Sequence, residues 1–156
     1  MKPASFEYAR PADLDQACAL LAHSEDTRII AGGQTLVPLM AMRLARPKRL
    51  IDIARISDLA FVRHELDAIA IGATTRQCVI ERGALVRAQV PLLAKVMPFI
   101  GHPAIRARGT IGGSLAQCRS GSGNHAWWRS RSARPCSIEK ARQTRKLRLR
   151  ISFSGQ

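Results

Sequence analysis

The sequence has few aromatic residues and no long apolar run. Phenylalanine, tryptophan and tyrosine make up 4% of its 156 residues, whereas 46% are hydrophobic, so the core must consist mainly of aliphatic side chains. No apolar run approaches the roughly 18 residues that a membrane-spanning helix needs. No charged segment followed by an apolar one opens the chain, as a secretory signal would require. We therefore expect a cytoplasmic globular protein with no membrane span.

Cysteine is scarce and irregularly spaced. Cys18, Cys78, Cys118 and Cys136 show no Cys-x-x-Cys spacing, so neither a structural zinc site nor a disulfide framework has support. We predict no metal site. Residues 1–117 also contain no evident acid, base or nucleophile constellation, and we predict no catalytic residue.

Acidic residues are also few, and they are distributed unevenly along the chain. The chain has 25 Lys and Arg against 11 Asp and Glu, a formal net charge of +14. Residues 118–156 contain one of those acidic residues, Glu139, and ten of the basic ones. Because a strong basic excess attracts nucleic acids and anionic membranes, the tail raises both as partners.

The first third of the chain alternates between strand and helix patterns. Residues 6–53 read as strand, helix, strand, helix, strand, which predicts a small parallel sheet with right-handed crossovers. Asp13 caps the first helix with Gln16 as its partner, and Cys18 is expected on the stripe that faces the core. Ligands of such sheets bind beyond the carboxyl ends of the strands.

Two glycine-rich segments are the main candidates for a binding site. The first, within residues 29–40 (IIAGGQTLVPLM), follows a strand predicted at 28–31 and precedes a helix predicted at 34–44. The second is GTIGGSLA at residues 109–116. Paired glycines let backbone N–H groups approach a phosphate, and two such loops suggest a pyrophosphate. Neither matches a P-loop or a Gly-x-Gly-x-x-Gly fingerprint, and an ordinary strand-to-helix connection is the alternative for each loop alone.

A second pattern begins near residue 56. Residues 59–64 and 68–73 read as a hairpin of two strands, and Thr74 and Thr75 can cap a helix at 76–81. A further helix is expected at 91–100, after which Gly101, His102 and Pro103 turn the chain towards the second glycine segment. We place one subdomain at residues 1–55, a second and incomplete one at 56–117, and a basic tail at 118–156.

Three segments, residues 31–53, 71–77 and 100–116, resemble the FAD-binding medium subunit of molybdenum hydroxylases. This group includes aerobic carbon monoxide dehydrogenase and xanthine dehydrogenase. The similarity runs in order over about residues 6–116. It implies an α+β fold of the PCMH type, in which a parallel βαβαβ subdomain is followed by a second α+β subdomain. It also implies non-covalent FAD, so His102 is read as a structural turn residue.

The resemblance further implies which residues contact FAD and which proteins bind the subunit. The partners implied are a large subunit with a molybdenum cofactor and a small subunit with iron–sulfur clusters, from which FAD passes electrons to an external acceptor. Arg106 and Arg108 are not counted among the FAD contacts; we expect them behind the contact residues or on the surface. The residues carried over are Ala31, Gly32, Gly33, Gln34, Thr35, Leu36, Thr75, Thr110, Ile111, Gly112, Gly113 and Ser114.

The tail does not fit this resemblance. Family members continue with an Asp-Pro pair, whereas Gln117 is followed by residues rich in arginine, serine and glycine, with no aspartate. We expect this tail to be disordered and to result from a frameshift near codon 117, which leaves a truncated subunit that is inactive alone. A Gly-x-Gly-x-x-Ala match at 121–126 has no strand before it and no helix after it, so it is rejected.

Two alternatives remain open. One alternative to the FAD-binding subunit is a non-functional remnant. The other is a basic protein that binds nucleic acid through the tail, where Trp127 and Trp128 would stack on bases and Arg129 and Arg131 would contact phosphates. We do not expect nucleic acid as the main partner, because basic disordered compositions arise without selection.

Overall fold

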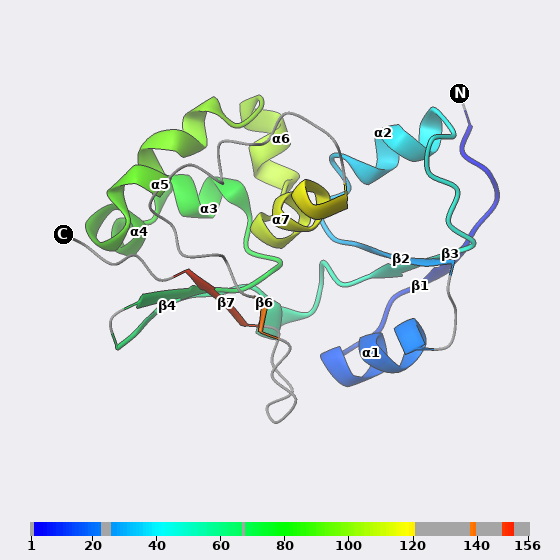
Figure 1. Ribbon diagram of the computed structural model, residues 1–156, viewed down its shortest axis with the longest axis horizontal. Coiled ribbons are helices and arrows are strands. Elements are labelled where there is room, and N and C mark those ends of the chain that lie inside the picture. The colour runs from blue at the N-terminus through cyan, green and yellow to red at the C-terminus, as the bar shows by residue number, and fades with distance from the viewer. Residues whose placement is uncertain (1, 23–25, 67, 121–137, 140–147, 152–156) are drawn as a thin grey trace.

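The computed structural model describes residues 2–22, 26–66, 68–120, 138–139 and 148–151. Within them, two sheets form the centres of two halves of the molecule (Figure 1). No helix in this part of the chain is long and apolar enough to cross a bilayer. The rejected motif at 121–126 and the tryptophan pair at 127–128 lie outside the described residues.

The first half is the predicted βαβαβ unit. Its strands run parallel in the order β1-β3-β2, and α1 and α2 lie on opposite faces of the sheet (Figure 1). The chain passes from β1 at one edge through α1 to β2 at the other edge, and α2 then leads it to β3 in the middle. The elements are β1 (Glu7–Ala9), α1 (Leu14–Ala22), β2 (Thr27–Ile30), α2 (Leu36–Ala41) and β3 (Arg49–Asp52).

The start of α1 follows the predicted capping pattern. The Asp13 carboxylate accepts a hydrogen bond from the Gln16 backbone at 2.8 Å, and the Gln16 side chain accepts one from the Ala12 backbone at 2.9 Å. The predicted burial of Cys18 is wrong, since this side chain is exposed. The helix packs on the sheet through Ala17, flanked by Leu14 and Leu20. Its buried stripe thus contains Leu20, whereas Cys18 and Leu21 are exposed.

The helix α2 is shorter than predicted. We expected a helix over residues 34–44, and the structure has six residues, Leu36–Ala41. It ends because Arg43 adopts a left-handed conformation with φ of 58°, and the Leu44 N–H then bonds back to the Leu39 carbonyl at 2.9 Å. Such a reversal is a common way for a helix to stop. A helix this short has little macrodipole to offer a ligand.

The second half places helices on one face of an antiparallel sheet (Figure 1). Its core is aliphatic, with Ile69 and Ile71 of the sheet packed against Ile80, Met97 and Ile111. The hairpin β4–β5 and the helix α3 confirm the prediction, while α4 and α6 were not predicted. The elements are η1 (Ser57–Leu59), β4 (Val62–Glu65), β5 (Ala68–Ile71), α3 (Gln77–Arg82), α4 (Ala84–Gln89), α5 (Pro91–Val96), η2 (Met97–Phe99), α6 (Pro103–Arg108) and α7 (Ile111–Ser120).

Two short pieces of the basic tail are strands, which differs from the disorder that we expected. They are β6 (Ile138–Glu139) and β7 (Arg148–Ile151), and β7 pairs antiparallel with β5, giving the sheet order β4-β5-β7-β6. The physical reason is the edge of β5, whose backbone groups need partners on the side away from β4. The alternation Arg-Leu-Arg-Ile at 148–151 was the sequence signal for this strand.

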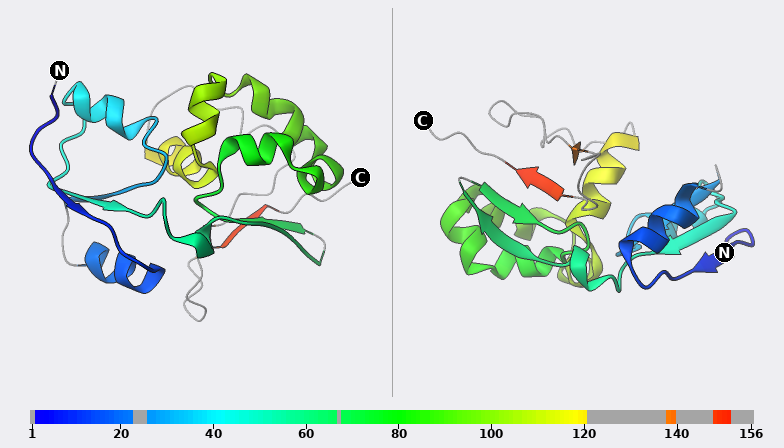
Figure 2. Two further views of the ribbon diagram at one scale, coloured as in Figure 1. Left: turned by 180° about the vertical axis from the view of Figure 1, so that it is seen from behind. Right: turned by 90° about the horizontal axis from the view of Figure 1, so that it is seen from below.

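The two halves meet at α7. This helix lies between the helices of the second half and the sheet of the first half in both views of Figure 2. The hydrophobic core of the first half also contains Ile56 and Leu59, and α7 continues to Ser120. The subdomain boundaries at residues 55 and 117 stay predictions.

Candidate functional site

The first glycine loop, residues 31–36, leaves the carboxyl end of β2 and depends on both of its glycines. Gly33 has φ of 69°, which strains any residue with a Cβ. A Cβ on Gly32 would lie 2.4 Å from the Arg108 carbonyl oxygen and 2.9 Å from the Gly109 Cα. The first glycine loop therefore touches the chain just before the second one, as expected if the two share a ligand.

The first glycine loop has a run of unpaired backbone donors. Val37 is the first residue of the turn whose N–H is bonded, to the Gly33 carbonyl at 3.0 Å. In the described chain, the N–H groups of residues 32–36 have no hydrogen-bond partner. The Gln34 side chain donates to the Gly32 carbonyl at 2.9 Å, which orders the loop. Because unpaired backbone N–H groups favour an anion, this segment can hold a phosphate.

Four of the five backbone N–H groups of the second glycine loop, residues 110–114, are occupied. The N–H of Ile111 bonds to the Thr75 carbonyl at 3.1 Å and that of Gly112 to the Ala73 carbonyl at 3.0 Å. The N–H of Gly113 bonds to the Thr110 hydroxyl at 3.3 Å, and that of Ser114 to the Thr110 carbonyl at 3.2 Å. The two glycine loops, which look alike in sequence, therefore differ in what they can offer a ligand.

Close packing explains the glycines around the second glycine loop. A Cβ on Gly112 would lie 2.7 Å from the Ala73 carbonyl oxygen. A Cβ on Gly109 would lie 2.7 Å from the Gln77 side-chain oxygen and 3.0 Å from the Ile105 carbonyl. These positions let α7 approach the β5–α3 connection, so they need no ligand to account for them.

Thr75 uses its hydroxyl inside the protein. The side chain is 3% exposed, donates to the Phe61 carbonyl at 2.9 Å and accepts from the Phe61 N–H at 3.1 Å. The expected capping of α3 by Thr74 or Thr75 is wrong, because the N-cap residue is Arg76 and its side chain makes no capping bond. Thr75 ties the start of α3 to the segment before β4, and its contact with a cofactor stays a prediction.

Gln77 was missed by sequence reasoning. It is buried, its N–H bonds to the Gly109 carbonyl at 2.9 Å, and its amide donates to the Ser114 hydroxyl at 2.8 Å. A glutamine in the first turn of a helix is ordinarily solvent-exposed, so no local pattern indicated this role. The contact fixes the predicted site residue Ser114 against α3.

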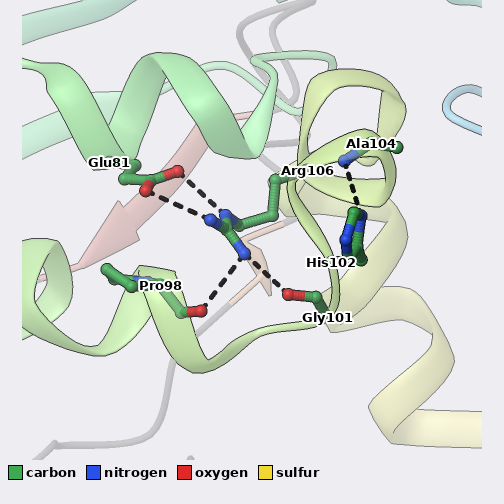
Figure 3. A network of polar contacts seen from close by, with 6 residues as sticks. All are labelled: Glu81, Pro98, Gly101, His102, Ala104 and Arg106. Carbon is green, nitrogen blue, oxygen red and sulfur yellow. Dashed lines mark hydrogen bonds and ion pairs between the residues drawn. The ribbon is translucent and has the colours of Figure 1, made fainter.

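Arg106 anchors α6, the helix that delivers the second glycine loop (Figure 3). Its guanidinium contacts the Glu81 carboxylate at 2.9 and 3.3 Å and the carbonyls of Pro98 and Gly101 at 3.1 and 2.6 Å. The hydrogen bond from Arg106 lowers the pKa of Glu81. His102 caps the same helix, accepting from the Ala104 N–H at 3.5 Å. Both side chains are thus occupied in holding the fold.

Comparison with known proteins supports the same reading. The family model described as "FAD binding domain in molybdopterin dehydrogenase" matches residues 4–150, so the match continues past Gln117, where we expected the resemblance to stop. The frameshift near that position stays a prediction.

Curated relatives and solved structures agree with this match. The caffeine dehydrogenase subunit beta of Pseudomonas sp. (strain CBB1) is 42% identical over 123 residues, which are 78% of this chain and 42% of that protein. The 6-hydroxypseudooxynicotine dehydrogenase complex subunit alpha of Paenarthrobacter nicotinovorans is 46% identical over 117 residues, 74% of this chain and 40% of that one. A solved carbon monoxide dehydrogenase from Hydrogenophaga pseudoflava, which lacks the Mo-pyranopterin moiety of its cofactor, superposes with a TM-score of 0.72 at 42% identity. The superposition covers 74% of this chain and 41% of the carbon monoxide dehydrogenase chain.

The chain spans about two fifths of the length of these relatives. FAD is the cofactor of the matching family, and the unpaired donors of the first glycine loop, with glycines where a Cβ would clash or be strained, suit its pyrophosphate. Sequence, fold and loop geometry agree, and the chain belongs to the family of FAD-binding domains of molybdopterin dehydrogenases.

Proposed function

We propose that this chain binds FAD non-covalently and that the first glycine loop holds its pyrophosphate. The observation that carries the proposal is the run of unpaired N–H groups at residues 32–36. The predicted contacts are Ala31, Gly32, Gly33, Gln34, Thr35 and Leu36. Bonds from N–H groups to a charged acceptor are worth about 1.5–3 kcal/mol each before the cost of immobilising the ligand.

The second glycine loop has a different part in this proposal. Thr110, Ile111, Gly112, Gly113 and Ser114 form the wall that faces the first glycine loop, and their internal bonds keep that wall rigid. The Thr110 hydroxyl, which accepts the weak bond from Gly113 at 3.3 Å, is the group there that could turn to a phosphate at least cost. The loop thus contributes shape first and donors second.

In the whole protein, we propose that the domain serves electron transfer within a molybdenum hydroxylase. FAD, when bound, supplies reversible oxidation and reduction, and the protein positions it and adjusts its electronic properties. The relatives are named as subunits or medium chains, so we propose two partners, a large subunit with a molybdenum cofactor and a small subunit with iron–sulfur clusters. We also propose a cytoplasmic location and an external electron acceptor.

The test is an FAD titration of the 156-residue chain, followed by quenching of flavin fluorescence, in the parent and in Gly33→Asp. We expect the substitution to weaken binding at least tenfold. Positive φ costs an L-residue roughly 1–2 kcal/mol, and the carboxylate repels the pyrophosphate. Gly33→Lys shares the strain without the repulsion and should bind better than Gly33→Asp.

Gly101→Asp is the matched control, because Gly101 also has a positive φ, 61°, and lies two residues before α6, outside both glycine loops. It should lose stability without the specific loss of FAD affinity. Equal FAD binding by the parent and Gly33→Asp would contradict the assignment of the loop. No binding by the parent would favour the remnant alternative, and a salt-dependent complex with DNA or RNA would favour the nucleic-acid alternative.

A further inference from the structure

Arg76 lies where the two glycine loops approach each other, and although it stands within the segment 71–77, it is not among the FAD contacts that the family resemblance implied. It precedes α3 and forms an isolated antiparallel bridge with Thr110, which places its backbone against the second glycine loop. Its guanidinium donates through Nη1 to the carbonyls of Ala107 at 3.3 Å and Arg108 at 3.0 Å. Arg76 thus contacts the end of α6 through its side chain and the second glycine loop through its backbone.

One carbonyl links Arg76 to the first glycine loop. The Arg108 oxygen that accepts from Arg76 Nη1 is the atom that a Cβ on Gly32 would meet at 2.4 Å. The Arg76 guanidinium and the Gly32 backbone therefore both approach the same oxygen atom. The positive charge of Arg76 thus lies one carbonyl group away from the first residue of the run of N–H groups that have no partner in the described chain.

The charge of Arg76 is not neutralised by a carboxylate. Arg49, Arg63 and Arg106 form ion pairs with Glu7, Glu65 and Glu81, respectively, whereas Arg76 forms none with the described acidic residues. Its Nη2 and Nε groups have no partner there either. A guanidinium can donate to a carbonyl through one nitrogen and to a phosphate oxygen through the others.

We propose that Arg76 is a cofactor-binding residue that supplies positive charge to the pyrophosphate held on the first glycine loop. This inference rests on the proposed function, because it needs a phosphate at residues 32–36. It adds a cation to a site that sequence reasoning built from N–H and hydroxyl groups alone. The bonds to Ala107 and Arg108 hold the guanidinium in place before the ligand arrives, which lowers the entropic cost of using it.

The experiment uses inorganic pyrophosphate and the full 156-residue chain. Binding is followed by chemical-shift changes of the backbone amides of residues 32–36, at low and at high salt. We expect Arg76→Gln to weaken pyrophosphate binding roughly tenfold, as for a lost charge-assisted hydrogen bond, and to reduce the salt dependence. Arg76→Lys keeps the charge, so it should keep the salt dependence with intermediate affinity.

Arg82→Gln is the matched control. Arg82 lies on α3 and lines a surface hollow with Pro91 and Lys95, and this hollow contains no residue of either glycine loop. The control removes the same charge and should leave pyrophosphate binding unchanged. Urea unfolding of the ligand-free variants measures how much Arg76 contributes to stability through its bonds to the Ala107 and Arg108 carbonyls. If Arg76 had this structural role alone, its loss would lower stability without changing the salt dependence of pyrophosphate binding.

The outcomes distinguish the two proposals. If the parent binds pyrophosphate on residues 32–36 and Arg76→Gln binds it equally well with the same salt dependence, the role of Arg76 is overturned and the proposed function stands. If the parent shows no binding of pyrophosphate or FAD, the proposed function is overturned, and the inference about Arg76 with it.

Discussion

At the scale of single residues, two residues of the same type can be required for different physical reasons. Gly33 is needed for its backbone conformation, with φ of 69°, and Gly112 for its closeness to the Ala73 carbonyl. Thr75 is buried, and its hydroxyl both donates and accepts a hydrogen bond, whereas the buried Thr74 hydroxyl beside it has no partner among the residues that the structure describes. The type of a residue in a motif therefore does not reveal whether it serves a ligand or the fold.

Thr75 offers a direct test of this point. Thr75→Val should lower the free energy of unfolding by about 1–3 kcal/mol, because it leaves the Phe61 N–H without its partner and removes one of the two hydrogen bonds to the Phe61 carbonyl, which keeps the bond from the Gly72 N–H. Thr75→Ser keeps the hydroxyl and should lose less. Urea unfolding of the two variants measures the difference. A normal stability of Thr75→Val together with lost FAD binding would show that the threonine serves the cofactor instead.

At the scale of elements, the second glycine loop is positioned by helices that sequence reasoning did not connect. Arg106 of α6 bonds to Glu81 of α3 and to carbonyls after α5, and Gln77 of α3 bonds to the start of α7. Residues 111–114 of this loop form the first turn of α7, which follows α6 closely, so the loop's position follows from these contacts. These contacts between helices determine whether the two glycine loops can face one ligand.

Arg106→Met should destabilise this arrangement strongly. The variant leaves the carbonyls of Pro98 and Gly101 without their donor and removes a buried cation, so we expect a loss of about 2–4 kcal/mol in the free energy of unfolding. Arg106→Lys retains the charge and should lose less. Thermal or urea unfolding measures this loss, and a spectrum of the folded state checks that each variant folds. A loss of less than about 0.5 kcal/mol would contradict the anchoring role.

The same pair predicts a pH dependence. Arg106 lowers the pKa of Glu81 in the folded state, so the pair stabilises the fold at pH above the ordinary glutamate pKa of about 4.3. This stabilisation is lost as the pH falls through the lowered folded-state value, because protonation removes the carboxylate charge. The difference in stability between the parent and Arg106→Met should therefore shrink on acidification. A difference that stays constant below pH 4 would show that the pair contributes no such linkage.

At the scale of the whole molecule, the second sheet is completed by a distant segment. The strand β7 pairs with β5 through Ile69 with Ile151 and Ile71 with Leu149, across about half the chain. Without β7, one side of β5 would have unpaired backbone groups and invite association between chains. The tail thus has a structural part in the described fold.

Leu149→Pro tests that pairing. Proline removes a backbone donor from the ladder, so we expect faster hydrogen exchange of the β5 amides and more association, seen by size-exclusion chromatography. Leu149→Val is the control and should behave like the parent. Unchanged exchange in Leu149→Pro would mean that the tail does not pair with β5, which would restore the unstructured tail that the sequence suggested.

The sequence by itself determined the local pieces. The order of strands and helices in residues 6–53, the hairpin at β4–β5 and the two glycine segments all followed from periodicity and turn chemistry, because those signals lie within a few residues of each other. The resemblance to FAD-binding subunits came from the same short motifs, and the family match confirms it.

Only the tertiary structure decided which glycine loop is free to bind. Two donors of the second glycine loop, the N–H groups of Ile111 and Gly112, bond to Thr75 and Ala73, which precede them by more than 30 positions. The Arg108 carbonyl that Arg76 contacts also lies against Gly32 of the first glycine loop. The exposure of Cys18 and the pairing of β7 were also beyond local reasoning. The physical reason is that hydrogen bonding and burial depend on neighbours in space, and periodicity gives no information on distant partners.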